Sequence, residues 1–268
     1  MSTWILLRGL TREARHWGEF PAQFGRIAGL TTNSDSIVTI ELPGNGHAHA
    51  ARSPADVAQF VASVRAAAAS QGLMPPYRVL AMSLGGMVAT SWAQHYPDEI
   101  ERLVLINTSM RPFCRITQRL RVGAWPRVIW IIANWHRPHT CERAIHALTC
   151  AVSEQGHDER DIDRWADIRR THPVSAHNGL RQLYAAARFE AAPAAPRCPT
   201  LLLSSAADRL VDPVCSARIA SQWGADHLEH AHANHDLPHD DPVWTSESVR
   251  NWLASVDQER KEIAVSAA

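Results

Sequence analysis

The sequence predicts an α/β protein with a mostly parallel central sheet of about six strands, flanked by helices. Short apolar runs rich in Val, Ile and Leu recur along the 268-residue chain, and helical patterns separate most of them. A content of 46% hydrophobic and 20% charged residues is ample for a buried core and excludes disordered or fibrous architectures. The expected strands span residues 4–7, 37–42, 77–82, 102–107, 200–204 and 227–231.

Two helices of this core have clear sequence signals. The first is expected to start with Ser53 as its N-cap and Pro54 in its first position, and to stop at Gly72. The other begins near Asp241 and Pro242 and should close the chain against the sheet. Because only three residues precede the first strand, we expect all six strands to be parallel, without an antiparallel opening hairpin.

Residues 108–197 break the strand rhythm. Amphipathic helical patterns replace it, so this segment is predicted to be a helical insertion between two strands of one sheet, with residues 1–107 and 198–268 forming the core. The insertion holds 14 arginines against 8 acidic residues, an excess of six positive charges. Its most apolar run, residues 128–132, is far shorter than the ~20 residues that cross a bilayer and should be a buried or interfacial helix.

Charge and cysteine content narrow the classes of partner. The formal net charge is zero and the pI is about 7.3, which argues against nucleic acid and membrane surfaces and favours a small-molecule partner. The five cysteines include no C-x-x-C pair, so we expect them to be reduced and buried or half-buried. No signal peptide is visible at the N-terminus, and the expected location is the cytoplasm.

The most informative segment is the apolar run that ends at Ser83 and continues through Leu84, Gly85 and Gly86 into a helical pattern. A serine on a sharp turn from strand to helix needs small residues two positions either side, and Ala81 and Gly85 meet that need. The free N–H groups at the start of the helix, near Leu84, would point to where an oxyanion forms. We therefore predict that Ser83 is a nucleophile.

A serine nucleophile needs a base and an orienting acid, and both are found downstream. Asp208 follows the expected strand 200–204, and His235 follows the last strand. Both should lie at the carboxyl edge of the sheet, where ligands of such sheets bind. Asp212 directly precedes Pro213 and is interpreted as the N-cap of the next helix.

With Ser83, Asp208 and His235 in this order, each after a different strand, the chain resembles the α/β-hydrolase superfamily over nearly its whole length. The loop Glu41-Leu42-Pro43-Gly44-Asn45-Gly46 looks like the family's D-x-P-G-x-G loop, and residues 96–106 match the segment that leads into the strand after the turn. The overall pattern is most similar to the small capped carboxylesterases, including those that demethylate pimeloyl-carrier-protein esters.

The resemblance implies that residues 108–197 are a helical cap and that the backbone N–H groups of Leu10 and Leu84 form the oxyanion hole. It implies no cofactor. One departure is Arg8, which stands where the family usually has a histidine before its loop glycine, here Gly9. Arg8 would add a positive charge near the site.

The function expected from these residues is hydrolysis of a carboxylic ester with a small or medium acyl group, through an acyl-enzyme, on a small-molecule substrate that could be linked to a carrier. The same three residues also suit thioester hydrolysis, carbon–carbon bond hydrolysis or perhydrolysis. A non-catalytic ligand-binding protein on this fold is the alternative from another class.

Two further patterns in the sequence involve histidines and arginines. Five histidines crowd residues 227–239, but strand alternation separates neighbours and no cysteine lies near them in sequence, so we predict no metal site there. Arginines of the insertion, such as Arg111, Arg115, Arg119 and Arg121, could attract an anionic substrate or an acidic carrier. The other interpretation is a solvated helix face.

Overall fold

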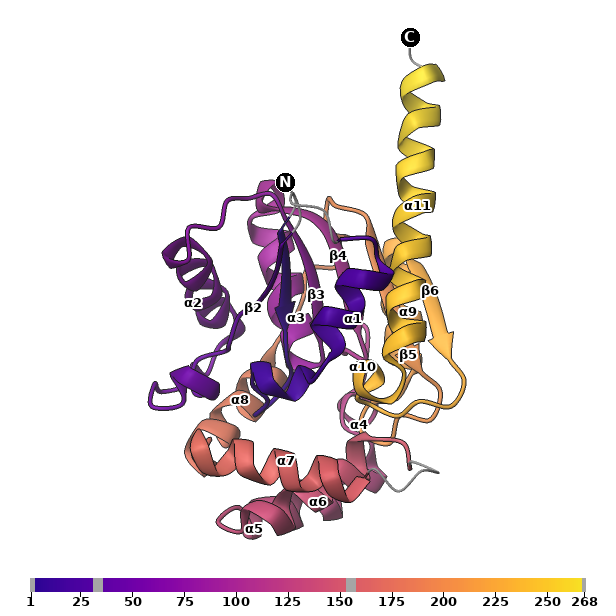
Figure 1. Cartoon of the computed structure of the whole chain (residues 1–268). Helices are drawn as coiled ribbons and strands as arrows, with labels where there is room; N and C mark the ends of the chain where they lie inside the picture. Colours follow the sequence, from indigo (N-terminus) through magenta and orange to yellow (C-terminus); the bar gives the residue numbers. More distant parts are fainter. Residues whose placement is uncertain (1–2, 31–35, 153–157, 267–268) are drawn as a thin grey trace.

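The predicted parallel sheet is present in the structure, a computed structural model that describes residues 3–30, 36–152 and 158–266 (Figure 1). Its six strands follow the order β2-β1-β3-β4-β5-β6, and every neighbouring pair is parallel. The strands are β1 (Thr3–Leu7), β2 (Ser36–Thr39), β3 (Tyr77–Met82), β4 (Ile100–Ile106), β5 (Thr200–Ser205) and β6 (Asp226–His230). The predicted fold class is confirmed, with β2 ending three residues earlier than expected.

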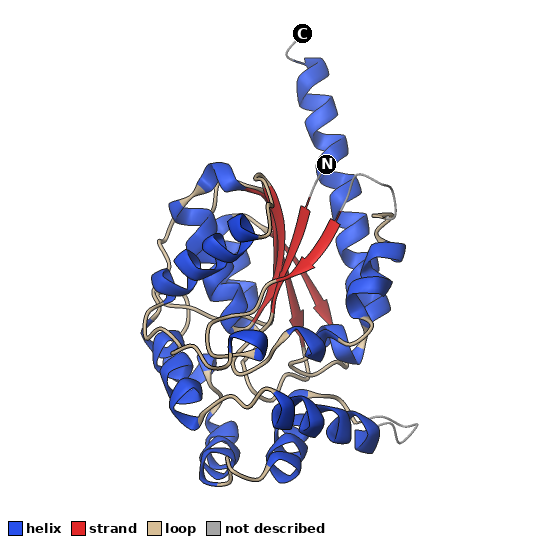
Figure 2. Ribbon diagram, turned by 60° about the vertical axis from the view of Figure 1, so that its left-hand side comes forward, coloured by secondary structure: helices blue, strands red, loops and turns tan. Residues whose placement is uncertain are grey.

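Helices cover both faces of the sheet (Figure 2). Successive strand residues point to opposite sides, so the apolar strands present side chains to both faces that the helices bury. One face packs on α2 (Val57–Ser70), α3 (Leu84–His95) and α9 (Val214–Trp223), and the other on α1 (Phe20–Ile27) and α11 (Pro242–Ser266). In β3, for example, Val79 and Ala81 join the first core while Leu80 and Met82 join the second. The sheet is therefore buried on both sides, and its carboxyl edge is the part left for a ligand.

Of the two core helices with clear sequence signals, one begins where the sequence predicted and the other does not. The C-terminal helix α11 begins at Pro242 as predicted, and the Asp241 side chain accepts the N–H of Trp244 at 2.9 Å. The prediction that Ser53 caps α2 is wrong. Asp56 is the N-cap and accepts the N–H of Ala58 at 2.7 Å. The Ser53 hydroxyl instead donates to the Pro43 carbonyl at 2.8 Å, so its side chain is used to fix the loop before the helix.

The described part of the segment between β4 and β5 is mainly helical, and it lies beside the carboxyl ends of the strands (Figure 1). Its helices are α4 (Ile116–Arg119), α5 (Trp125–Ala133), α6 (Pro138–Thr149), α7 (Asp158–Thr171) and α8 (Ala176–Arg188), and residues 153–157 of the predicted insertion lie outside the described residues. The apolar run 128–132 falls in α5. There Ile131 is buried and Ile129 is 65% exposed, so α5 is an interfacial helix as expected.

Short 3₁₀ turns complete the architecture: η1 (Ala14–Trp17), η2 (Gly46–Ala48), η3 (Pro97–Glu99) and η4 (Val122–Ala124), together with the one-turn helix α10 (Leu237–Asp240). All five cysteines are free thiols, four of them buried and Cys198 half-buried, as predicted. Among the described residues, no helix has both the length and the apolar character that crossing a membrane requires.

Candidate active site

Ser83 occupies the sharp turn between β3 and α3, with backbone angles of φ 54° and ψ −121°. A positive φ is costly for a residue with a side chain, so the surrounding contacts must hold it. The Ser83 N–H donates to the Ile106 carbonyl at 3.0 Å, and the Thr108 hydroxyl donates to the Ser83 carbonyl at 2.8 Å. The backbone of Ser83 is thus fixed by the end of the neighbouring strand β4.

Small residues make this turn possible, as the sequence indicated. A Cβ atom on Gly85 would lie 2.6 Å from the carbonyl oxygens of Leu7 and Arg8, which is too close for any side chain. A Cβ atom on Gly9 would lie 2.9 Å from the Cβ of Ser83. These glycines let the loop after β1 approach the serine closely. That loop carries Leu10, and α3 begins at Leu84.

His235 and Asp208 form a buried pair at the same edge of the sheet. The Nδ1–H of His235 donates to Asp208 Oδ2 at 2.7 Å, and both side chains are at most 6% exposed. The other carboxylate oxygen of Asp208 accepts the N–H groups of Leu210 and Val211, at 2.7 Å and 2.9 Å. Asp208 is therefore held in place by backbone donors while one of its oxygens faces the imidazole.

The protonation of His235 is set by opposing effects. Burial favours the neutral imidazole, but the charge of Asp208, its hydrogen bond and the charge of Asp236 together raise the pKa of His235 above its ordinary value. A histidine of this kind binds a proton readily, and Asp208 stabilises the resulting imidazolium.

Asp212 has no contact of this kind with His235. Its Oδ1 accepts the N–H of Val214, the first residue of α9, at 3.1 Å, but the N-cap of α9 is Pro213, one residue later than the sequence predicted.

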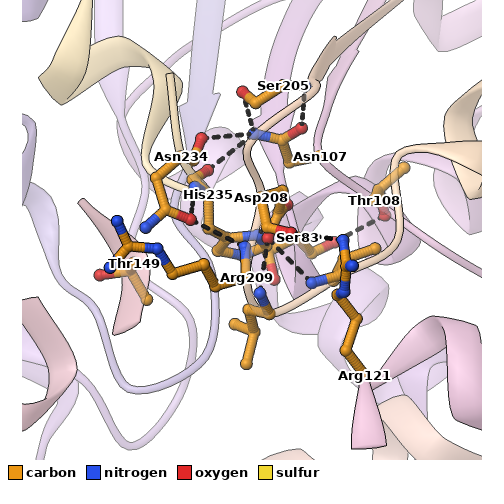
Figure 3. A network of polar contacts seen from close by, with 12 residues as sticks. Ser83, Asn107, Thr108, Arg121, Thr149, Ser205, Asp208, Arg209, Asn234 and His235 are labelled. Carbon is orange, nitrogen blue, oxygen red and sulfur yellow. Dashed lines mark hydrogen bonds and ion pairs between the residues drawn. The ribbon is translucent and has the colours of Figure 1, made fainter. Parts of the chain in front are cut away.

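Asn107, which the sequence analysis missed, connects the elements around this pair (Figure 3). Its side-chain amide donates to the carbonyl of His235 at 2.8 Å and to the hydroxyl of Ser205 at 2.9 Å, and its Oδ1 accepts the Ser205 N–H at 3.0 Å. Its φ is 45°, a conformation that asparagine tolerates better than most residues. The sequence signal that could have identified it is its position as an asparagine at the carboxyl end of β4.

Asn234 and Arg121 support the same loops from the other side. Asn234 Oδ1 accepts the N–H groups of His235 and Arg209, both at 2.9 Å. The Arg121 guanidinium donates to the backbone carbonyl of Asp208 at 2.9 Å (Figure 3). The loops that carry Asp208 and His235 are thus tied both to each other and to the helical segment between β4 and β5.

Arg8 does place a guanidinium near the site, but its charge is paired. It makes a bidentate contact with Asp236, with N···O distances of 2.9 Å and 2.6 Å, and both side chains are buried. Burial raises the pKa of Asp236, but the charge and hydrogen bonds of Arg8 outweigh burial and lower it to about 2. Because Asp236 follows His235, the pair anchors the histidine loop to the end of β1.

Ser83 and His235 open into one cavity of about 190 Å³. Its wall also includes Leu10 and Leu84, so the structure brings all of the sequence-predicted site residues except Asp208 to this surface, with Asp208 directly behind His235. Helices α5, α6 and α8 supply most of the far wall with apolar side chains: Val128, Ile131, Ile132, Ile145, Leu148, Leu180 and Leu183. The cavity therefore suits an apolar group placed next to a serine and a histidine.

The arginines singled out in the sequence are mostly tied to backbone carbonyls. Arg111 donates to Arg188, Arg121 to Asp208, and Arg119 to Ala186 and Ala187. Arg119 is the one of the four that lines the cavity, and its buried Nε has no partner among the described residues. Arg115 is exposed. The four arginines therefore form neither one shared anion site nor one solvated helix face.

Comparison with known proteins gives a consistent result. The family model described as serine aminopeptidase, S33 (Hydrolase_4) matches residues 43–241, which include Ser83, Asp208 and His235. The chain is 33% identical over 168 residues to the pimeloyl-[acyl-carrier protein] methyl ester esterase of Chromobacterium violaceum. That match covers 62% of this chain and 56% of the relative, so the chain spans little more than half of the relative's length.

Solved structures share the fold across most of the chain. The enol-lactonase from Burkholderia xenovorans LB400 superposes with a TM-score of 0.72 at 19% identity, covering 94% of this chain and 91% of that one. A hydrolase from Pseudomonas aeruginosa PA01 gives a TM-score of 0.75 at 19% identity, covering 94% and 89%. At such identities the similarity concerns the fold alone.

Proposed function

Because the chain belongs to the serine aminopeptidase S33 (Hydrolase_4) family of α/β hydrolases, we propose that this hydrolase cleaves a carboxylic ester through a covalent acyl-serine intermediate. Ser83 is the proposed nucleophile, His235 the general base and Asp208 the acid that orients it. The observation that carries the proposal is that His235, which lines the same cavity as Ser83, is hydrogen-bonded to the buried Asp208 behind it.

In the first step, His235 takes the Ser83 hydroxyl proton while the serine oxygen bonds to the ester carbonyl carbon. The backbone N–H groups of Leu10 and Leu84 are proposed to stabilise the oxyanion, since both residues line the cavity beside Ser83. The tetrahedral intermediate then expels the alcohol, which receives the proton from His235.

In the second step, His235 removes a proton from water, which attacks the acyl-serine and releases the carboxylic acid. His235 returns the proton to Ser83 as the acyl–oxygen bond breaks. Asp208 stabilises the imidazolium in both steps, and no metal or cofactor takes part in this scheme.

Residues 108–197 are proposed to act as the cap that selects the acyl group, since α5, α6 and α8 form the apolar wall opposite Ser83. The relative from Chromobacterium violaceum acts, by its name, on the methyl ester of a carrier-linked pimeloyl group. We propose by analogy a small or medium acyl ester for this chain, free or carrier-linked.

A panel of p-nitrophenyl and methyl esters of rising chain length, together with a fluorophosphonate label, tests the proposal. We expect hydrolysis of at least part of the panel and stoichiometric labelling of Ser83. Ser83→Ala should fold normally and lose on the order of 10⁴-fold or more in kcat, because Ser83 is held by its turn rather than by side-chain packing. Ser91→Ala on the same helix is the matched control. Labelling elsewhere, or near-normal turnover by Ser83→Ala, would refute the assignment.

A further inference from the structure

A cluster of potential metal ligands lies beside the candidate active site and takes no part in the proposed chemistry. His146 projects from α6, Cys150 follows the end of that helix, and His239 belongs to α10. One ligand atom from each residue lies within 4.8 Å of the other two. The cluster therefore joins the helical segment between β4 and β5 to the loop that follows His235.

A second observation points to a ligand. The His146 imidazole is only 5% exposed, yet its buried Nε2 has no hydrogen-bond partner among the described residues. Leaving a buried polar nitrogen unpaired costs on the order of 1–3 kcal/mol, so most such groups in folded proteins are satisfied. A cation bound between the three side chains would use this nitrogen.

The surroundings resemble the outer shell of a metal site. Asp161 Oδ2 lies 3.5 Å from His239 Nε2, and histidine ligands commonly have a carboxylate at their second ring nitrogen. The ring of Trp165 packs on both histidines, with centroid distances of 5.2 Å to His146 and 5.3 Å to His239. Trp165 would hold both imidazoles in place and keep water from one side of the ion.

We propose that His146, Cys150 and His239 bind one Zn²⁺ ion, with a fourth position left for water. Two imidazoles and one thiolate suit a borderline-soft ion, whereas Mg²⁺ and Ca²⁺ prefer oxygen ligands. On binding, the Cys150 thiol gives its proton to solvent as the Zn–S bond forms, and the neutral histidines donate lone pairs. The oxidation state of the ion does not change.

Such an ion would fasten α6 to the loop that carries His235. Thr149, next to Cys150, already accepts the N–H of Asp236 through its carbonyl at 2.7 Å, and Asp236 directly follows His235. The sequence analysis found no cysteine near His239 because Cys150 lies 89 positions earlier and approaches only in the folded chain.

The test is spectroscopic and does not depend on enzyme activity. The full chain is stripped of metal with a chelator and titrated with Co²⁺, which shows a thiolate charge-transfer band when it binds cysteine. We expect one equivalent to produce the band and Zn²⁺ to displace it. Cys150→Ser should abolish the band, whereas Cys198→Ser, which alters a half-buried thiol outside the cluster, should leave it unchanged.

Thermal unfolding gives an independent readout, since a ligand that binds only the native state raises Tm. Zn²⁺ should raise the Tm of the wild type and of His177→Ala, an exposed control, and not that of His239→Ala. We expect His239→Ala to weaken Co²⁺ binding at least tenfold. A missing Co²⁺ band in the wild type, the same band in Cys150→Ser, or an equal Tm rise in His239→Ala would overturn the proposal.

Discussion

At the residue scale, the two carboxylates near His235, those of Asp208 and Asp236, have different roles. Asp208 faces the imidazole of His235, and two backbone N–H groups hold its other oxygen. Asp236, the next residue in the chain, instead pairs with Arg8 and neutralises its charge. Because the pKa of Asp236 is lowered to about 2, its ionised form stabilises the fold above the unfolded value near 4, and this contribution is lost as pH falls toward 2. Of the two, Asp208 is the one that bonds to the imidazole of His235.

Substitution of the two candidate acids separates their roles. Asp208→Asn should leave the fold intact and reduce kcat by several orders of magnitude, because the amide cannot stabilise the imidazolium. Asp212→Ala should keep its activity and lose about 1 kcal/mol of stability through the lost hydrogen bond to the N–H of Val214 at the start of α9. Steady-state kinetics and denaturant unfolding of both variants check this. A large loss of activity in Asp212→Ala with normal turnover in Asp208→Asn would mean that the two assignments are exchanged.

The pH dependence of kcat/KM provides a second residue-scale prediction. Protonated His235 cannot accept the Ser83 proton, so activity should fall as pH decreases through the pKa of this histidine. Asp208 raises that pKa against the effect of burial, so the midpoint of the acid limb should lie above the ordinary histidine value. Circular dichroism over the same range controls for unfolding. A midpoint below the ordinary value would show that burial dominates.

The elements around the site explain which features a sequence pattern can predict. The turn after β3 was predictable because a strand, a serine and two glycines adjoin in sequence, and the positive φ of Ser83 follows from that local geometry. Asn107 and Asn234 were missed because their roles depend on β4, β5 and the histidine loop meeting in space. The start of α2 was misplaced since Ser53 has a tertiary partner, the Pro43 carbonyl.

The strand-to-helix turn can be tested as an element through its glycines. Gly85→Ala should destabilise the fold by roughly 1–3 kcal/mol and reduce activity, because the new Cβ would meet the backbone carbonyls of Leu7 and Arg8 at 2.6 Å. Gly123→Ala is the matched control, since within the described structure no atom beyond its chain neighbours lies within 4 Å of the added Cβ, and it should change stability by at most ~0.5 kcal/mol. Urea unfolding and ester hydrolysis measure both. Equal effects would show that the close approach at Gly85 is not a constraint.

At the scale of the whole molecule, two parts of the chain together form the candidate active-site cavity. The sheet edge supplies Ser83 and His235, and the helices between β4 and β5 supply the apolar wall. Strand runs and the order of Ser83, Asp208 and His235 made the first part predictable. The second was not, because the directions of α5, α6 and α8 over the sheet depend on long-range packing. For the same reason, the net charge of residues 108–197 did not reveal that Arg119 alone of the four named arginines faces the cavity.

The positive charge of residues 108–197 should therefore affect substrate preference through Arg119 in the cavity wall, rather than by long-range attraction of the substrate. Exposed charges are screened beyond ~8 Å at physiological ionic strength, whereas Arg119 is buried in the cavity wall and its Nε has no hydrogen-bond partner among the described residues. Arg119→Met should lower kcat/KM for a carboxylate-bearing ester about 10- to 100-fold more than for a neutral ester, as expected for a lost hydrogen bond to a charged group. The difference should persist across a salt series.

Arg111→Met, which also loses a bond to a helix carbonyl but does not line the cavity, controls for stability, and Arg115→Ala should behave like the wild type. If Arg115→Ala instead removes a salt-sensitive preference for the carboxylate ester, exposed charge rather than the cavity governs that preference.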